Sequence, residues 1–192
     1  MRRFLGFTML IGAVALLAAA PAAAEGDHAF VGSKNCKKCH IKQYKSWEDT
    51  KMAQAYESLK PGVDAEAKAE MGLSADEDYT QNAECVACHV TGHGKEGGFT
   101  SEADTPELAG VGCEMCHGAG GTYTQDGYMT LKNKEYKLSE LVAVGLVEKV
   151  SEAQCIQCHN ENVPIEGYTF DFETKKEEGT HENFPLKYDH SG

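Results

Sequence analysis

Apolar residues recur at helical spacing in two stretches of this 192-residue chain. Between Ile41 and Leu59 they fall three or four positions apart, and the helix-ending pair Pro61-Gly62 follows directly. Between Leu138 and Val150, leucines and valines occupy adjoining faces of a helix. The pattern therefore predicts helices over 41–59 and 138–150.

Shorter elements are predicted between and after these helices. Residues 64–71 favour a weaker helix, and Ser151 with Gln154 has the spacing of a capping box that opens a short one. Three segments are expected outside helices: loops over 92–98 and 118–127, and a short extended piece over 167–172. Together with 20 glycines, this predicts short helices joined by long loops.

The N-terminus has the pattern of a secretory signal. Arg2 and Arg3 precede an uncharged apolar run, and the small residues Ala22 to Ala24 follow it. We expect cleavage after Ala24, which divides the chain into a signal peptide, 1–24, and a single domain, 25–192. An uncleaved anchor is the alternative, and after cleavage no apolar stretch is long enough to span a membrane.

All eight cysteines fall in Cys-x-x-Cys-His motifs. The motifs are Cys36, Cys39 and His40; Cys85, Cys88 and His89; Cys113, Cys116 and His117; and Cys155, Cys158 and His159. Each motif supplies two thiols that can add to the vinyl groups of one haem and an imidazole that can bind its iron. The sequence therefore predicts four covalently bound haem c groups, each with its iron.

Disulfides and zinc knuckles are the other readings of paired cysteines in an exported chain. Neither explains why a histidine follows every second cysteine. With so few residues for each haem, the macrocycles themselves are expected to form much of the interior. The predicted fold class is mainly α, a compact multihaem cytochrome c with short helices and long loops wrapped around four covalently bound haems.

The formal net charge is −12, and signal cleavage removes two arginines and no acid, so the mature charge is more negative still. Such a surface excludes nucleic acid as a partner and favours a redox protein with a basic face. Solubility alone is the other explanation for the charge.

The histidine of each motif is the predicted proximal iron ligand, and the sixth ligands are open. Met52 lies twelve residues after His40, roughly 18 Å along a helix at about 1.5 Å per residue, so it cannot close the first haem. His93 follows His89 too closely to cross the ring, and is expected to bind a propionate or lie at the surface. His28 and His190 lie near the chain ends, where surface histidines are expected.

Beyond the motifs, three blocks of sequence carry a resemblance to a known family. They are CKKCHIKQYKSWEDTKMAQAYESLKP from Cys36, DYTQNAECVACHVTGHGKEGGFT from Asp78 and GVGCEMCHGAG from Gly110. The chain resembles the cytochrome c-554 family, tetrahaem cytochromes that accept electrons from hydroxylamine oxidoreductase in ammonia-oxidising bacteria. The resemblance implies a mostly helical fold with closely packed haem pairs.

The resemblance also implies sixth ligands. It leaves the haem on His89 high-spin, places Met52 opposite the third haem and Met129 opposite the first, and places His181 opposite the fourth. This chain has methionine at two positions where the family has histidine. If both methionines bind, the first and third haems should have higher potentials than the fourth.

The predicted function is electron transfer by a periplasmic or secreted carrier, and no catalytic triad or phosphate loop is found. Electrons would come from a dehydrogenase or quinol-linked cytochrome and pass to a reductase or an outer-surface cytochrome. One alternative is an enzyme that binds nitric oxide or hydroxylamine at a five-coordinate haem on His89. Another is a self-associating subunit of a conductive filament, with a histidine donated between copies.

Overall fold

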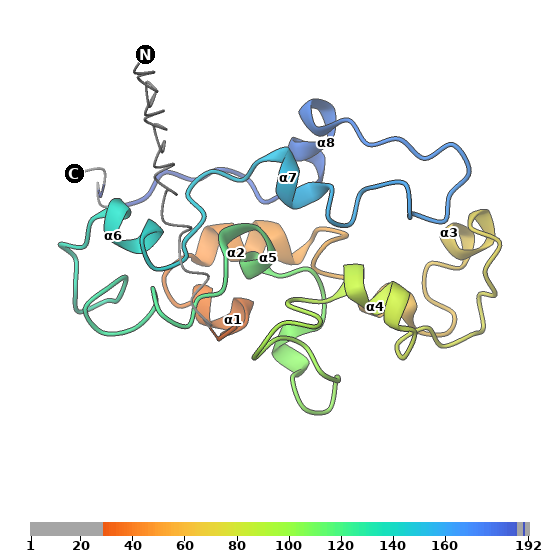
Figure 1. Ribbon diagram of the computed structural model, residues 1–192, viewed down its shortest axis with the longest axis horizontal. Coiled ribbons are helices and arrows are strands. Elements are labelled where there is room, and N and C mark those ends of the chain that lie inside the picture. Colours follow the sequence, from red (N-terminus) through yellow and green to blue (C-terminus); the bar gives the residue numbers. More distant parts are fainter. Residues whose placement is uncertain (1–28, 188–189, 191–192) are drawn as a thin grey trace, which may run out of the picture.

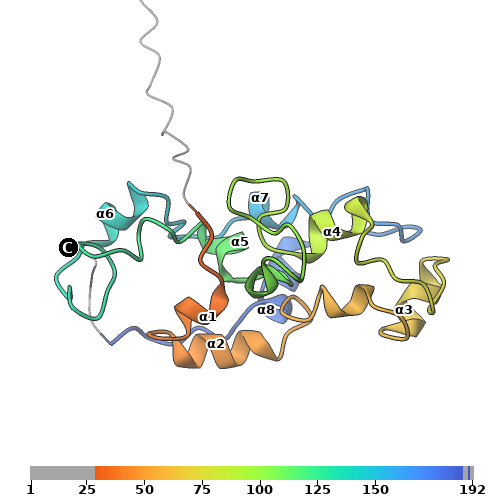
Figure 2. The same ribbon diagram turned by 90° about the horizontal axis from the view of Figure 1, so that it is seen from below.

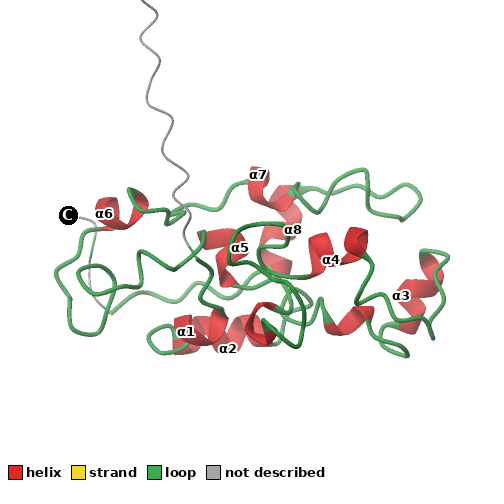
Figure 3. Ribbon diagram, turned by 60° about the horizontal axis from the view of Figure 1, so that its bottom comes forward, coloured by secondary structure: helices red, strands yellow, loops and turns green. Residues whose placement is uncertain are grey.

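The computed structural model describes residues 29–187 and 190, and the expected signal peptide and His28 lie outside them. The helices are short: α1 Ser33–Cys36, α2 Ile41–Glu48, α3 Ala65–Glu70, α4 Ala83–His89, α5 Cys113–His117, α6 Leu138–Val142, α7 Glu152–Cys155 and α8 Phe172–Gly179. Two single turns of 3₁₀ helix, η1 Glu57–Leu59 and η2 Pro106–Leu108, complete the described part. Within it no strand forms, as Figure 3 shows, and one isolated bridge joins Val90 to Ala109.

Helices α2 and α5 lie across the middle of the molecule, with α3 and α6 at opposite ends (Figure 1). The segment that follows α8 returns along α2, where the Glu182 backbone N–H donates to Ser46 Oγ at 2.8 Å. The Gln43 side chain donates to the Phe184 carbonyl at 3.4 Å on the same side. From below, α1, α2 and α8 lie along one edge and α7 lies at the opposite edge (Figure 2).

The apolar core is small. One cluster holds seven buried side chains: Tyr56, Leu59, Tyr79, Val86, Val90, Phe99 and Leu108. They come from the segment between α2 and the end of η1, from α4 and the residues on either side of it, and from η2 and the loop before it, so this core surrounds the second motif. Beside the first motif lies a cavity of about 1270 Å³, lined in part by the buried side chains of Tyr44, Tyr123 and Leu141.

The helix predicted over 41–59 is wrong in its length, because α2 ends at Glu48. Thr50 causes the break, since its hydroxyl donates to the Trp47 carbonyl at 2.7 Å and accepts from the Ala53 N–H at 3.3 Å. Such side-chain bonds compete with the helical backbone ladder. Met52 consequently lies in a turn and not on a continuous helix.

The helix predicted over 138–150 is also too long, because α6 ends at Val142. Gly145 adopts a φ of 102°, and the Leu146 N–H then donates to the Leu141 carbonyl at 3.0 Å. This is the hydrogen bond of a glycine-terminated helix end. The next residue, Val147, donates its N–H to the His117 carbonyl at 2.9 Å, so the chain turns towards the third motif.

Other local predictions are confirmed. The weak helix over 64–71 is α3, with Asp64 and Met71 as its caps, and 92–98 and 118–127 are loops. Ser151 caps α7, and Gln154 Oε1 accepts from its backbone N–H at 2.9 Å.

Of the extended piece expected over 167–172, residues 168–171 form no helix, and Asp171 has an extended backbone. Phe172 already begins α8, a helix that was not predicted from the sequence. Asp171 Oδ1 accepts from the Thr174 N–H at 3.0 Å, and this N-cap was the available signal.

Candidate haem-binding site

The first and third motifs are held together by a buried carboxylate. Glu114, in α5 between Cys113 and Cys116, is 3% exposed. Its oxygens accept from the backbone N–H groups of Val31 at 2.9 Å, Gly32 at 2.8 Å and Gly120 at 2.6 Å. Because Gly32 is the N-cap of α1, these bonds fix the start of the first motif against the helix of the third.

Two buried hydroxyl groups continue this attachment. Ser33 Oγ, in α1, accepts from the Cys113 N–H at 3.1 Å. Thr91, two residues after His89, donates to the Gly110 carbonyl at 2.8 Å and accepts from the Gly112 N–H at 2.8 Å. The third motif is therefore hydrogen-bonded to the residues that flank both the first and the second.

The thiols of different motifs also approach one another. A hydrogen bond with Cys36 lowers the pKa of Cys113 to about 6, and the same bond raises that of Cys36. Burial raises the pKa of Cys158 to about 12, with further contributions from the charge of Cys88 and a hydrogen bond with it. The first motif thus lies beside the third, and the second beside the fourth.

Three of the four motif histidines use Nδ1 for a hydrogen bond. His89 Nδ1 donates to the Ala55 carbonyl at 2.6 Å, and His117 Nδ1 donates to the Val147 carbonyl at 3.4 Å. His159 Nδ1 lies 2.7 Å from the Tyr168 hydroxyl. A proton on Nδ1 leaves the Nε2 lone pair for a metal, and such outer partners are typical of metal-binding histidines.

Burial lowers the pKa of His40, His117 and His159 below the usual histidine value. This favours the neutral imidazole, which is the form that binds metal.

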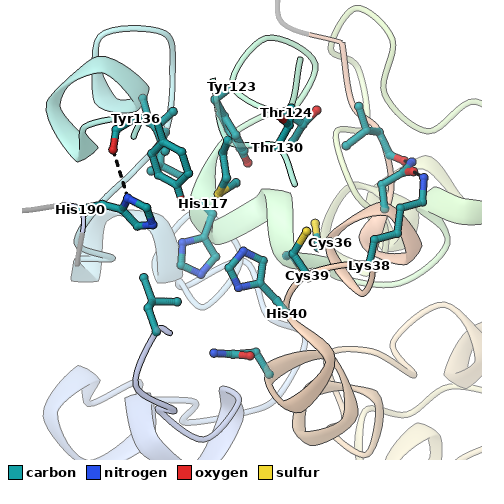
Figure 4. Close-up of a pocket in the computed structure, with 18 of the residues that line it drawn as sticks. Cys36, Lys38, Cys39, His40, His117, Tyr123, Thr124, Thr130, Tyr136 and His190 are labelled. Carbon is teal, nitrogen blue, oxygen red and sulfur yellow. Dashed lines mark hydrogen bonds between the residues drawn. The ribbon is translucent and has the colours of Figure 1, made fainter. Parts of the chain in front are cut away.

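The cavity lies where the first and third motifs face each other. Its lining includes Cys36, Cys39, His40, Cys113 and His117. Figure 4 shows the rings of His40 and His117 directed into this space, with Cys36 and Cys39 beside it. Its volume of about 1270 Å³ exceeds the roughly 300–1,000 Å³ typical of a pocket for one small ligand.

The donor set fits covalently bound haem. All eight cysteines are free thiols, so no disulfide occupies the positions that the thioether bonds need. Among the described residues no cluster of three histidine, cysteine or acidic side chains could hold a bare metal ion. Thiol pairs, adjacent imidazoles and a large hollow therefore suit a flat macrocycle attached at its edge.

The expected sixth ligands are distributed unevenly. His181 and Met129 both line the cavity of the first and third motifs. The His181 ring lies 6.1 Å from the His117 ring between centroids, at 23°, whereas the resemblance assigned it to the fourth haem. Beside His159 lies Phe170 instead, 4.7 Å between ring centroids.

Met52 lies near the third motif and α8. Its carbonyl accepts from the Val111 N–H at 2.9 Å. Its methyl group lies 3.1 Å from the position that a Cβ on Gly179 would occupy.

His93 is exposed, in agreement with the surface position expected for it. His190 differs from its expected surface role, because it is partly buried and lines the cavity. Tyr168, the partner of His159, was also missed, and no sequence pattern marks it.

A mainly helical chain with repeated thiol pairs, each followed by a metal-binding imidazole, defines the class of multihaem c-type cytochromes. The comparisons with known proteins agree. A family model described as "Cytochrome c554 and c-prime" matches residues 35–118, which contain the first three motifs. Cytochrome c-554 of Nitrosomonas europaea is 38% identical over 84% of this chain and 78% of that protein.

A solved structure of the reduced state of Nitrosomonas europaea cytochrome c554 superimposes with a TM-score of 0.70. The match has 38% identity and covers 84% of this chain and 88% of that one. The chain belongs to the cytochrome c-554 family. It is an electron-transport protein with covalently bound haem c, and redox proteins are its partners.

Proposed function

We propose that the chain is a tetrahaem electron carrier with one haem on each motif. Cys36 and Cys39, Cys85 and Cys88, Cys113 and Cys116, and Cys155 and Cys158 form the thioether bonds. His40, His89, His117 and His159 are the proximal ligands. Each iron, when bound, gains and loses one electron, and the chain keeps the irons close enough to exchange it.

The observation that carries this proposal is the adjacency of the motifs. Hydrogen bonds of Glu114 and Ser33 connect the first motif to the third. Hydrogen bonds of Thr91 connect the second motif to the third. These hydrogen bonds hold motifs that are far apart in the sequence next to one another. Haems attached to them therefore form one connected group.

His181 is the proposed sixth ligand of the haem on His117. Imidazoles that bound one metal ion from opposite sides, each at about 2 Å, would have ring centres roughly 6 Å apart. The two ring centroids are 6.1 Å apart. Both Nδ1 atoms point to backbone carbonyls, that of Val147 at 3.4 Å and that of Glu182 at 2.8 Å, which directs both Nε2 atoms elsewhere.

This assignment makes Met52 a packing residue for the third haem in place of the predicted ligand. His181→Ala should convert one low-spin haem to high-spin, and Met52→Ala should leave the potentials unchanged. Redox titration with electron paramagnetic resonance measures both. Loss of a low-spin signal in Met52→Ala would contradict this assignment and support Met52 as the sixth ligand.

We also propose that residues 1–24 are a cleaved signal and that the single domain, 25–192, works in the periplasm or outside the cell. Haem attachment to exported thiols suits that setting. In the described residues, no helix has the length and apolar character that crossing a bilayer requires.

A redox partner is proposed to dock beside the first motif, on a group of exposed lysines that we call the lysine face: Lys34, Lys37, Lys38, Lys42 and Lys45. Cys39, which carries the edge of the first haem, is itself exposed there. Although the chain is acidic overall, this contact favours a partner with an acidic patch. The donor is a dehydrogenase or quinol-linked cytochrome, and the acceptor is a reductase or outer-surface cytochrome.

The test is intact-mass measurement of the native protein together with redox titration. The proposal expects four haem additions and reversible one-electron steps. A mass with fewer haems, or haems that titrate without exchanging electrons with one another, would overturn it.

The enzyme and filament alternatives stay untested predictions. A high-spin signal changed by nitric oxide, followed by turnover, would favour the enzyme at the His89 haem. Assembly larger than a monomer would favour the filament.

A further inference from the structure

His190 is held at the cavity by three contacts with Tyr136 and with Leu138, the first residue of α6. Its ring stacks on Tyr136, 3.8 Å between centroids and 16° between planes. Its carbonyl accepts from the Leu138 N–H at 2.8 Å, and its Nδ1 lies 3.1 Å from the Tyr136 carbonyl. The ring face, the Nδ1 atom and the backbone carbonyl of His190 all have partners. The side chain is therefore held in a defined position, unlike that of an ordinary surface histidine.

The tautomer follows from these contacts. A carbonyl oxygen can only accept, so His190 Nδ1 carries the proton and donates it to Tyr136. The lone pair then resides on Nε2, the nitrogen on the other side of the ring. Figure 4 shows this side of His190 directed into the cavity, towards the rings of His117 and His40.

The position of Tyr136 ties His190 to the first motif. Cys39, His40, Tyr136 and His190 line the same cavity. Met129, the ligand that the resemblance implied for the first haem, lines it too.

We propose that His190 is the sixth ligand of the haem attached to Cys36 and Cys39, opposite His40, and that Met129 packs beside this haem without binding iron. This inference rests on the proposed attachment of haem to the first motif. Imidazole with an outer carbonyl partner is a stronger donor to iron than a thioether. The first haem is therefore a His/His centre of lower potential than His/Met ligation would produce.

The experiment compares His190→Ala, Met129→Ala and the control His93→Ala in the full haem-loaded protein. Electron paramagnetic resonance counts the low-spin haems, and near-infrared magnetic circular dichroism distinguishes His/His from His/Met ligation. In His190→Ala we expect one His/His centre to be lost, replaced by a high-spin or a His/Met centre. Met129→Ala and His93→Ala should keep the wild-type ligation.

Added imidazole separates ligation from mere support of the fold. It should restore the lost low-spin centre in His190→Ala and change nothing in Met129→Ala. If His190→Ala yields too little protein, His190→Met should replace one His/His centre by His/Met and raise one potential. An unchanged His/His count in both His190 variants, or loss of a His/Met signature in Met129→Ala, would overturn the proposal.

Intact mass keeps this inference distinct from the proposed function. Four haems in every variant with unchanged ligation would refute His190 alone. Fewer than four haems in the wild-type protein would refute the tetrahaem carrier itself.

Discussion

Single side chains decide how the motifs meet, and Glu114 is the clearest case. Its carboxylate is 3% exposed and accepts from the backbone N–H groups of two residues that precede the first motif and from the loop after the third. Hydrogen bonds to this charged acceptor are strong, because the buried N–H donors have no water molecule as an alternative partner. One residue thereby joins segments that are more than eighty positions apart.

Glu114→Gln should destabilise the protein by roughly 1.5–3 kcal/mol, the usual worth of hydrogen bonds to a charged group. Whichever way the amide turns, its NH₂ faces a backbone N–H that needs an acceptor. Urea unfolding of the haem-loaded protein measures the loss. Glu96→Gln, at an exposed loop position, is the matched control, and equal midpoints for the two variants would contradict the role of Glu114.

Tyr168→Phe tests the outer partner of His159, whose Nδ1 lies 2.7 Å from the tyrosine hydroxyl. If Nε2 binds iron, Nδ1 carries the proton and the hydroxyl accepts it, which makes the imidazole a better electron donor. Without that acceptor, oxidised iron is less stabilised, so one haem potential should rise. Redox titration against Tyr128→Phe checks this, and an unchanged or lower potential would speak against it.

At the scale of elements, short helices serve as carriers of the motifs. Helices α4, α5 and α7 each contain or lead directly into one thiol pair. Helices of four to seven residues are not stable alone, so caps and tertiary contacts must hold them. Asn82 does so for α4, since its Oδ1 accepts from the N–H groups of Glu84 at 3.0 Å and Cys85 at 3.4 Å.

Asn82→Ala should therefore cost about 1 kcal/mol of stability, the typical value for loss of an N-cap. Asn82→Asp keeps the accepting oxygen and should stay close to the wild type. Urea unfolding of both variants gives the comparison. The cap has no such role if the alanine and aspartate variants unfold at the same midpoint.

At the scale of the whole molecule, the charge is distributed unevenly over the surface, and the cavity lies at the first and third motifs. The net charge is −12, yet five exposed lysines lie on α1, on α2 and in the segment between them, beside the first motif. Among residues 29–187, no ion pair neutralises the lysine face. A local positive field beside the proposed haem edge speeds encounters with negative partners, and at 0.1 M salt this effect is largely screened beyond about 10 Å.

Lys37→Glu with Lys38→Glu should slow oxidation by the anion ferricyanide about tenfold or more at low ionic strength. The same change should speed reaction with the cationic hexaammineruthenium complex. Stopped-flow mixing measures both rates. Lys95→Glu with Lys149→Glu carries the same charge change at exposed positions outside the lysine face, and equal rates for the two double variants would contradict docking there.

How much the sequence foretold depends on how local each feature is. The thiol pairs and their histidines lie within five consecutive residues, so their chemistry can be read directly, and the mainly α class follows with them. The helix starts at Ile41 and Glu152 were likewise predictable from local patterns. The helix ends were not, because Thr50 and Gly145 redirect the backbone through bonds that hydrophobic spacing does not record.

The sequence by itself determined the proposed sites of cofactor attachment, since thioether formation needs only a pair of thiols and a neighbouring imidazole. Tertiary structure alone decided which motifs meet and which distant residues lie beside the proposed haem sites. His181 reaches His117 and His190 reaches the first motif because the C-terminal segment returns along α2 and then to α6. That path depends on hydrogen bonds between residues more than fifty positions apart, which no local pattern encodes.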